Sequence, residues 1–236
     1  MVLEKDSAVK KKEKPDKEDK EIEKMFQLGV HFGHSHSKKH PKMDPFVYGT
    51  RNNIDLIDLA QTKTSLEKAL EYLKSKKKSL ILFVATKPSA RKIVKALAEK
   101  IKMPYVTERW LGGTLTNFEV IKKRIDYLKD LEAKEKEGEL EKYTKKERVR
   151  IHQEIERIKR KLDGLRNLDR LPDLLFVVDV KKEKAAIKEA HQKNITLVGI
   201  CDTNGDPGLV DCPIFANDEA VSSLRYIMEK VEKPLS

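Results

Sequence analysis

The residues with the most distinctive chemistry lie in residues 108–118, whose sequence is ERWLGGTLTNF. Arg109 offers a planar fork of donors for phosphate, and Trp110, the single Trp of the chain, offers a flat face for stacking. The two glycines that follow lack side chains, so a partner can approach the backbone closely. Three structural interpretations compete: a buried Trp anchor, a glycine turn, and Asn117 as the N-cap of a helix. We predict that Arg109, Trp110 and Asn117 contact a nucleic acid.

A second candidate surface is rich in histidine and lysine. Residues 29–50 read GVHFGHSHSKKHPKMDPFVYGT. The histidines have no H-E-x-x-H spacing and no Cys partner, so a phosphate-binding loop is preferred over a metal site or plain packing. From this loop and the residues after it we predict nucleic-acid contacts by His31, His34, Lys38, Lys39, His40, Lys42, Arg51 and Asn52.

A third candidate is the junction at residues 86–89, where an apolar strand ends and Pro88 opens a helix. The free N–H groups of a helix N-terminus favour anions, and Lys87 and Arg91 add positive charge there. We predict that both bind phosphate. The chain has neither G-x-G-x-x-G nor G-x-x-x-x-G-K-[ST], which argues against a nucleotide-dependent enzyme.

Carboxylates follow two of the later strands. Asp202 and Asp206 lie in the run DTNGD, and Asp218 lies in the run NDEA. Because the carboxyl ends of parallel strands meet at one sheet edge, His34, Asp202 and Asp218 could hold zinc or magnesium. The structural alternative is that these residues form Asx turns and a helix N-cap at Asn217. No cofactor is expected to be required, and nothing resembles a nucleophile–base pair.

Apolar runs and helical periodicities alternate along most of the chain. Short apolar runs predict strands at residues 54–59, 80–85, 104–106, 174–178, 196–201 and 214–215, with helical spacing between them. Strands that are apolar throughout are typical of a parallel sheet covered on both faces. We therefore predict an α/β body with a Rossmann- or flavodoxin-like sheet.

Residues 119–170 interrupt this alternation. Leucine and isoleucine recur there in two seams, and the second has the 4-3-4-3 spacing of a coiled coil, with Gly138 between them as a turn. We predict an inserted helical hairpin, the alternative being two ordinary surface helices. The body then comprises residues 25–118 and 171–236, and residues 1–24 form a charged tail that is disordered or loosely helical.

The charge of the chain points to a polyanionic partner. Lys and Arg number 50 against 39 Asp and Glu, a net charge of +11. Almost the whole excess lies in residues 25–118, with 17 cations against 7 acids. A nucleic acid is therefore the first expectation. The longest apolar runs are too short to span a bilayer, so no membrane partner is expected.

Taken in series, these motifs resemble the bacterial ribosomal protein S2 family of the small subunit. The resemblance runs from about residue 25 to residue 231 and is carried by the segments quoted above together with LILFVAT, LPDLLFVVDV, AIKEA, CDTNGDP and ANDEA. Where the family commonly has Arg-Arg-Trp before a Pro-Lys-Met triplet, this chain has Lys38, Lys39 and His40. The positive charge is kept there, but the aromatic side chain is not.

The resemblance implies a structural constituent of the small ribosomal subunit, located in the cytoplasm within the ribosome. It implies contacts with ribosomal RNA and neighbouring ribosomal proteins, and docking of the large messenger-binding ribosomal protein where that protein exists. Neither enzymatic activity nor a homo-oligomer is expected. Two other classes remain as alternatives: an α/β enzyme acting on a phosphorylated ligand, and a coiled-coil adaptor outside the ribosome.

Overall fold

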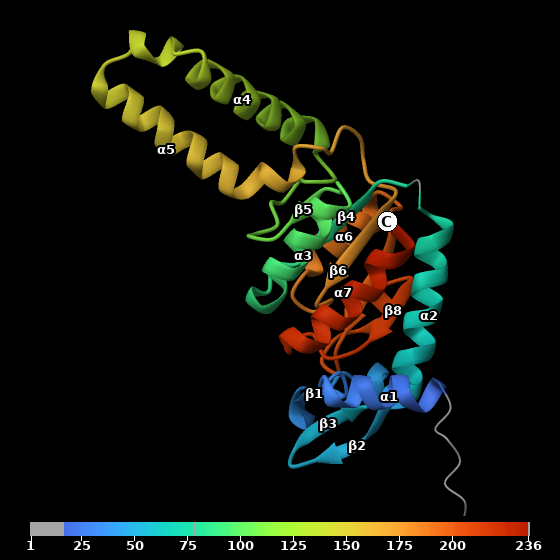
Figure 1. Ribbon diagram of the computed structural model, residues 1–236. Coiled ribbons are helices and arrows are strands. Elements are labelled where there is room, and N and C mark those ends of the chain that lie inside the picture. Colours follow the sequence, from blue (N-terminus) through green and yellow to red (C-terminus); the bar gives the residue numbers. More distant parts are fainter. Residues whose placement is uncertain (1–16, 78, 236) are drawn as a thin grey trace, which may run out of the picture.

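A parallel sheet forms the centre of the computed structural model, which describes residues 17–77 and 79–235 (Figure 1). The strand order is β5-β4-β6-β7-β8, which is 2-1-3-4-5 in chain order and matches flavodoxin-like folds. The strands are β4 (Ile81–Val84), β5 (Tyr105–Val106), β6 (Leu174–Val178), β7 (Thr196–Cys201) and β8 (Cys212–Phe215). The predicted α/β fold with a parallel sheet is confirmed.

Helices cover both faces of this sheet because its strands are apolar on both sides. In β4, Ile81 and Phe83 pack into one core cluster, whereas Leu82 and Val84 pack into the other. The first face is covered by α2 (Leu59–Ser75), α3 (Pro88–Lys100) and α7 (Val221–Leu235). The second is covered by α6 (Lys184–Gln192) and the first turns of α4 (Phe118–Lys136). Burial on both faces requires the near-continuous apolar runs seen in the sequence.

A small antiparallel sheet of order β1-β3-β2 lies at one end of the body (Figure 1). Its strands are β1 (Phe32–Ser35), β2 (Val47–Arg51) and β3 (Ile54–Ile57), with 3-10 turns at His36–Lys38 and Pro41–Phe46 between β1 and β2. The assignment of residues 54–59 to the parallel sheet was therefore wrong. Asn52 and Asn53, at φ 50° and 61°, form the tight turn that returns β2 onto β3.

Residues 17–24, predicted as part of a disordered or loosely helical tail, belong to a helix. Helix α1 (Lys17–Gln27) includes residues 17–24, and Met25 and Ile22 pack against the core beside α2 and α7. Buried apolar contacts give this charged helix a stable position, which the composition of residues 1–24 did not reveal. The prediction for residues 1–16 lies outside the described residues.

Two antiparallel helices, α4 and α5 (Lys145–Leu162), project from the body at the end opposite the small sheet (Figure 1). A short link with Gly138 at φ 73° and a 3-10 turn at Glu139–Lys142 joins them. Thr144 and Glu147 form a capping box that starts α5. Leu128, Leu131 and Ile155 are the buried contacts of their outer part. Supercoiling of the pair as a coiled coil stays a prediction.

Candidate nucleic-acid interface

The loop at residues 108–118 is anchored by its tryptophan. Trp110 is only 8% exposed, and its indole Nε1 donates a hydrogen bond to Oε1 of Glu189 at 2.9 Å. Its ring packs in the core cluster on the second face of the parallel sheet. The prediction of Trp110 as a stacking contact is therefore wrong, and the buried-anchor interpretation is right.

The Glu189 carboxylate organises the whole loop. Besides the indole it accepts hydrogen bonds from the backbone N–H groups of Gly113, Leu115 and Thr116, at 2.9–3.1 Å, and from the Thr116 hydroxyl. Burial would raise the pKa of Glu189, but these donors outweigh it and hold the pKa below its usual value. One side chain of α6 thus fixes the path of the chain into α4.

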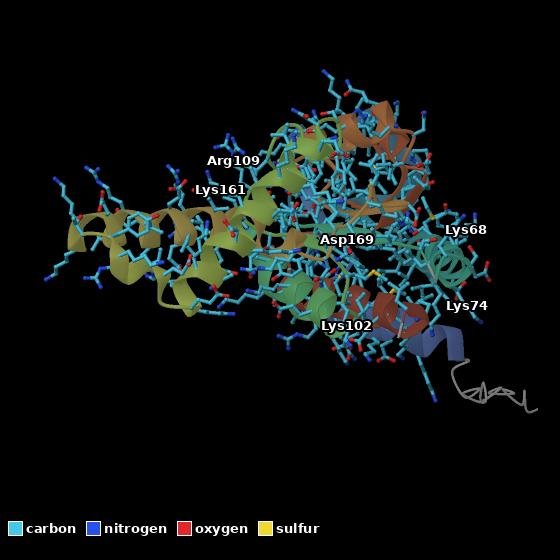
Figure 2. All side chains as sticks on the ribbon, turned by 90° about the horizontal axis from the view of Figure 1, so that it is seen from above. Lys68, Lys74, Lys102, Arg109, Lys161 and Asp169 are labelled. Carbon is cyan, nitrogen blue, oxygen red and sulfur yellow. The ribbon has the colours of Figure 1, made fainter. Side chains whose placement is uncertain are left out.

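Two predicted contacts of this loop are open to solvent. Arg109 is exposed and projects away from the ribbon near the base of the hairpin (Figure 2). Among the described residues no carboxylate pairs with it. Asn117 is also exposed; it is the N-cap residue of α4, but its side chain makes no capping hydrogen bond. Both remain available to a partner.

The histidine-rich segment is partly internal. His31 is 7% exposed and its ring stacks on Phe26, with centroids 4.4 Å apart. Burial lowers the pKa of His31, which favours the neutral ring. The prediction of His31 as a phosphate contact is therefore wrong, because an internal neutral imidazole adds no charge to the surface.

Several other residues of this segment are paired with carboxylates of the same chain. Lys39 binds Asp44 at 2.6 Å, and Lys42 binds Asp206 at 2.9 Å. His40 lies 3.9 Å from the same Asp206 carboxylate. These exposed pairs are weak enough to exchange for phosphate, so the predicted contacts remain accessible without being free.

The remaining predicted contacts of the small sheet face solvent. Lys38, Arg51 and Asn52 are exposed. Arg51 and Asn52 lie at the β2–β3 turn, and within the described chain neither Lys38 nor Arg51 forms an ion pair. This turn and Lys38 are the parts of the segment that fit the prediction best.

Lys87 lies inside a group of acids at the carboxyl edge of the parallel sheet. Its Nζ is 2.5 Å from Asp218 and 3.4 Å from both Asp179 and Glu219. Burial would lower the pKa of Lys87, but the three carboxylates raise it. Lys87 is thus already paired with three carboxylates inside the fold, and its contact with RNA stays a prediction.

Thr86, the residue before the N-cap of the neighbouring helix, is also engaged from within. The Thr86 backbone N–H and hydroxyl donate to Oε1 of Glu183, which is buried. Arg91 is half-buried. It pairs with Glu108 at 3.3 Å and donates a hydrogen bond to the Thr86 carbonyl oxygen, so its guanidinium already has partners within the chain. A buried carboxylate of the chain itself thus lies beside the junction where the sequence predicts an anion.

The three residues predicted as metal ligands do come together. One ligand atom from each of His34, Asp202 and Asp218 lies within 4.8 Å of the others. His34 Nδ1 pairs with Asp202 Oδ2 at 3.0 Å and His34 Nε2 with Glu219 at 3.2 Å, whereas the buried Asp218 Oδ2 has no hydrogen-bond partner. Gly33 makes this approach possible, because a Cβ at its position would lie 2.4 Å from Thr203.

This cluster carries more negative than positive charge. Burial, and then the nearby Asp202 and Asp179, raises the pKa of Asp218 to about 7. Asp202 likewise raises the pKa of His34. The groups can therefore share protons or a cation, which fits the donor set of a divalent-ion site.

Helix α5 is the cationic element that the sequence analysis missed. It carries eight Lys and Arg against three Glu, and none of the eight forms an ion pair within the described part of the chain. The signal is present in the sequence, but over the whole insertion the nearly neutral α4, with six cations against five acids, masks it. Counting charge helix by helix would have found it.

Comparison with known proteins identifies the family of this chain. The family model described as ribosomal protein S2 matches residues 25–235. The chain belongs to the ribosomal protein S2 family. It is 44% identical over 212 residues to small ribosomal subunit protein uS2 of Coprothermobacter proteolyticus, covering 89% of this chain and 79% of that protein. It is 42% identical to small ribosomal subunit protein uS2c of Rhodomonas salina, covering 91% and 89%, and 42% identical to uS2 of Thermus thermophilus, covering 89% and 82%.

Membership of the S2 family decides between the classes left open by the sequence. Ribosomal protein S2 is a structural component and not an enzyme, so neither the phosphoryl-ligand enzyme nor the non-ribosomal adaptor is favoured. None of the helices in the described residues is long and apolar enough to cross a membrane.

Proposed function

We propose that this S2-family chain is built into the small ribosomal subunit by binding ribosomal RNA and neighbouring ribosomal proteins, in the cytoplasm. It acts by neutralising phosphates and by presenting a fixed shape, with no reaction on a substrate. The observation that carries the proposal is the unpaired charge of α5, which no group inside the described chain requires. Arg109, Lys38 and Arg51 are exposed cations of the body that also form no ion pair within the described chain.

The hairpin holds the positive charge of α5 away from the body. The cations of α5 are exposed along a helix that stands away from the sheet (Figures 1 and 2). Helix α4 carries six Lys and Arg against five acids, so α5 is the more positive of the two helices. A duplex RNA presents phosphates over a similar length, which such a helix can follow without reading sequence. Docking of the large messenger-binding ribosomal protein belongs to this proposal too, as an implication of the family.

The salt dependence of binding tests the electrostatic mechanism. With purified protein and transcribed small-subunit ribosomal RNA, about five engaged cations predict a log–log slope of the binding constant near −4. Arg109→Ala should make the slope shallower by about 1. Lys74→Ala, on the exposed side of α2 away from the hairpin, is the matched control and should leave it unchanged (Figure 2). A slope near zero for the native protein would exclude the mechanism.

We also propose that His34, Asp202 and Asp218 hold a divalent ion, with zinc favoured by the imidazole. The support is the convergence of one ligand atom from each of the three residues, the unpartnered Asp218 Oδ2, and the excess of carboxylates around Lys87. A bound ion would fix the loop after β7 to the small sheet by neutralising this charge.

Elemental analysis of protein purified without chelator tests the ion. About one equivalent is expected, reduced strongly by Asp202→Asn and unchanged by Asp206→Asn, whose carboxylate pairs with Lys42 instead. Less than about a tenth of an equivalent in the native protein would mean that these residues serve only as turns and caps.

A further inference from the structure

A cleft lies at the base of the hairpin, where α4, α5 and the loop after β5 meet. Its volume is about 470 Å³, and its walls include Leu111, Arg124, Tyr127, Arg157 and Lys161. The volume lies within the range of small-molecule sites in proteins. None of these five residues was among the contacts predicted from the sequence.

One wall of the cleft is an aromatic ring. Tyr127 of α4 is 45% exposed, and no other ring or cation of the described residues stacks on it. An exposed aromatic face is a platform for an unstacked base. Since Trp110 is buried, Tyr127 is the exposed aromatic residue that lines this cleft.

Cations stand on both helices around this ring. Arg124 precedes Tyr127 by three residues on α4, and Arg157 and Lys161 are four residues apart on α5, so each pair shares a helix face. Glu154 is the single acid of the lining, against three cations. In the described chain none of the three cations forms an ion pair, which leaves their donors for a phosphate.

The rest of the cleft is apolar and held in place. Ile158 and Leu162 contribute from α5, both packed against the core clusters. Leu111 comes from the loop whose backbone is fixed by hydrogen bonds to Glu189. The cleft is thus formed before any ligand arrives, which reduces the entropy lost on binding.

We propose that this cleft binds one unpaired nucleotide of an RNA, with its base on the Tyr127 ring and its phosphate between Arg124, Arg157 and Lys161. The apolar and aromatic surface matches a base, and the surrounding cations match the sugar-phosphate backbone. This inference rests on the proposed RNA-binding function, to which it adds a site that reads an extruded base instead of the duplex backbone.

Two probes separate stacking from charge. Fluorescence anisotropy of the full chain is measured with a single-stranded oligouridylate of about ten nucleotides and with an abasic oligomer of equal length. Tyr127→Ala should weaken oligouridylate binding about tenfold and leave abasic binding unchanged. Tyr127→Phe should keep the native affinity. Arg157→Ala should weaken both probes.

Tyr143→Ala is the matched control, because Tyr143 is 49% exposed but lies at the far tip of the hairpin. It should behave like the native protein. The site is overturned if Tyr127→Ala binds oligouridylate normally, if it loses both probes equally, or if the native protein does not distinguish the probes. If small-subunit ribosomal RNA still binds in those cases, only the nucleotide site fails. If the native protein binds neither that RNA nor the oligomers, the proposed function fails as well.

Discussion

Gly164 lies so close to Tyr105 that a Cβ on the glycine would be 2.2 Å from the Tyr105 carbonyl oxygen. This contact joins the end of the hairpin to the edge strand β5 of the parallel sheet. Because backbone and not a flexible side chain opposes the added atom, the two elements would have to separate to accept it. The close approach therefore defines how the hairpin leaves the body.

Gly164→Ala should destabilise the protein by about 1–3 kcal/mol, the usual range for forcing extra volume into a packed site. Urea unfolding measures the change. Gly112→Ala is the control, since a Cβ there meets nothing within 4 Å, and it should be close to neutral. Equal stabilities of the two variants would show that the hairpin base is not packed as described.

Removing the Glu189 carboxylate should release the loop that carries Arg109. Glu189→Ala leaves an indole N–H and several backbone N–H groups without acceptors, which should cost about 2–4 kcal/mol. Trp110 is the single Trp, so its emission should move to longer wavelength as the ring meets water. Lys188→Ala, the exposed neighbour on α6, should change neither property. Native emission and stability in Glu189→Ala would contradict the anchoring role.

The outer hairpin should unfold separately from the body. Ile155 is 2% exposed and belongs to the small cluster formed with Leu128 and Leu131, so Ile155→Asp should melt this part first. Hydrogen exchange would accelerate in α5 while Trp110 emission stays native. Val149→Asp, at a position 51% exposed, is the control. Simultaneous loss of all signals would mean that the hairpin and body form one cooperative unit.

The base of the hairpin, unlike its outer part, packs with the core of the body. Ile121, Ile125, Leu162 and Leu165 belong to the core cluster on the second face of the sheet, not to the outer seam. Deletion of the whole insertion should therefore expose part of the body core, whereas a cut outside these residues should not.

Glu183 should make the stability fall as the pH rises. Burial raises the pKa of Glu183, so its stabilising contribution is complete below its unfolded pKa and is lost as the pH rises through the folded pKa. Glu183→Gln keeps an acceptor for Thr86 but cannot ionise. Its melting temperature should exceed that of the native protein at pH 8 and approach it at acidic pH. A gain of equal size at both pH values would rule out ionisation as the cause.

Periodicity and strand composition predicted the parallel sheet because two-sided burial dictates both. The short strands β1 and β2 escaped notice, since their residues are half exposed and their pairing depends on β3 and the asparagine turn. An exposed edge strand has no apolar run to mark it. Ile54 was assigned to the wrong sheet for the same reason, because an apolar run does not show which strand it pairs with.

The candidate site was predictable where sheet topology decides it. His34, Asp202 and Asp218 converge because two of them follow adjacent parallel strands, β7 and β8. By contrast, residue type alone could not place Trp110, His31 and Lys87. Trp110 and Lys87 are held by partners far along the chain, Glu189 and Asp218, and the His31 ring stacks on Phe26 of α1.

Sedimentation of cell extracts in a sucrose gradient tests the central claim most directly. If the chain is a constituent of the small ribosomal subunit, it should co-migrate with that subunit at low salt. Its release on raising the salt concentration should come earlier for Arg109→Ala than for Lys74→Ala. Little free protein is expected in the native sample. Quantitative recovery of the native chain in the light fractions, with small subunits intact below it, would mean that the chain is not a constituent of that subunit.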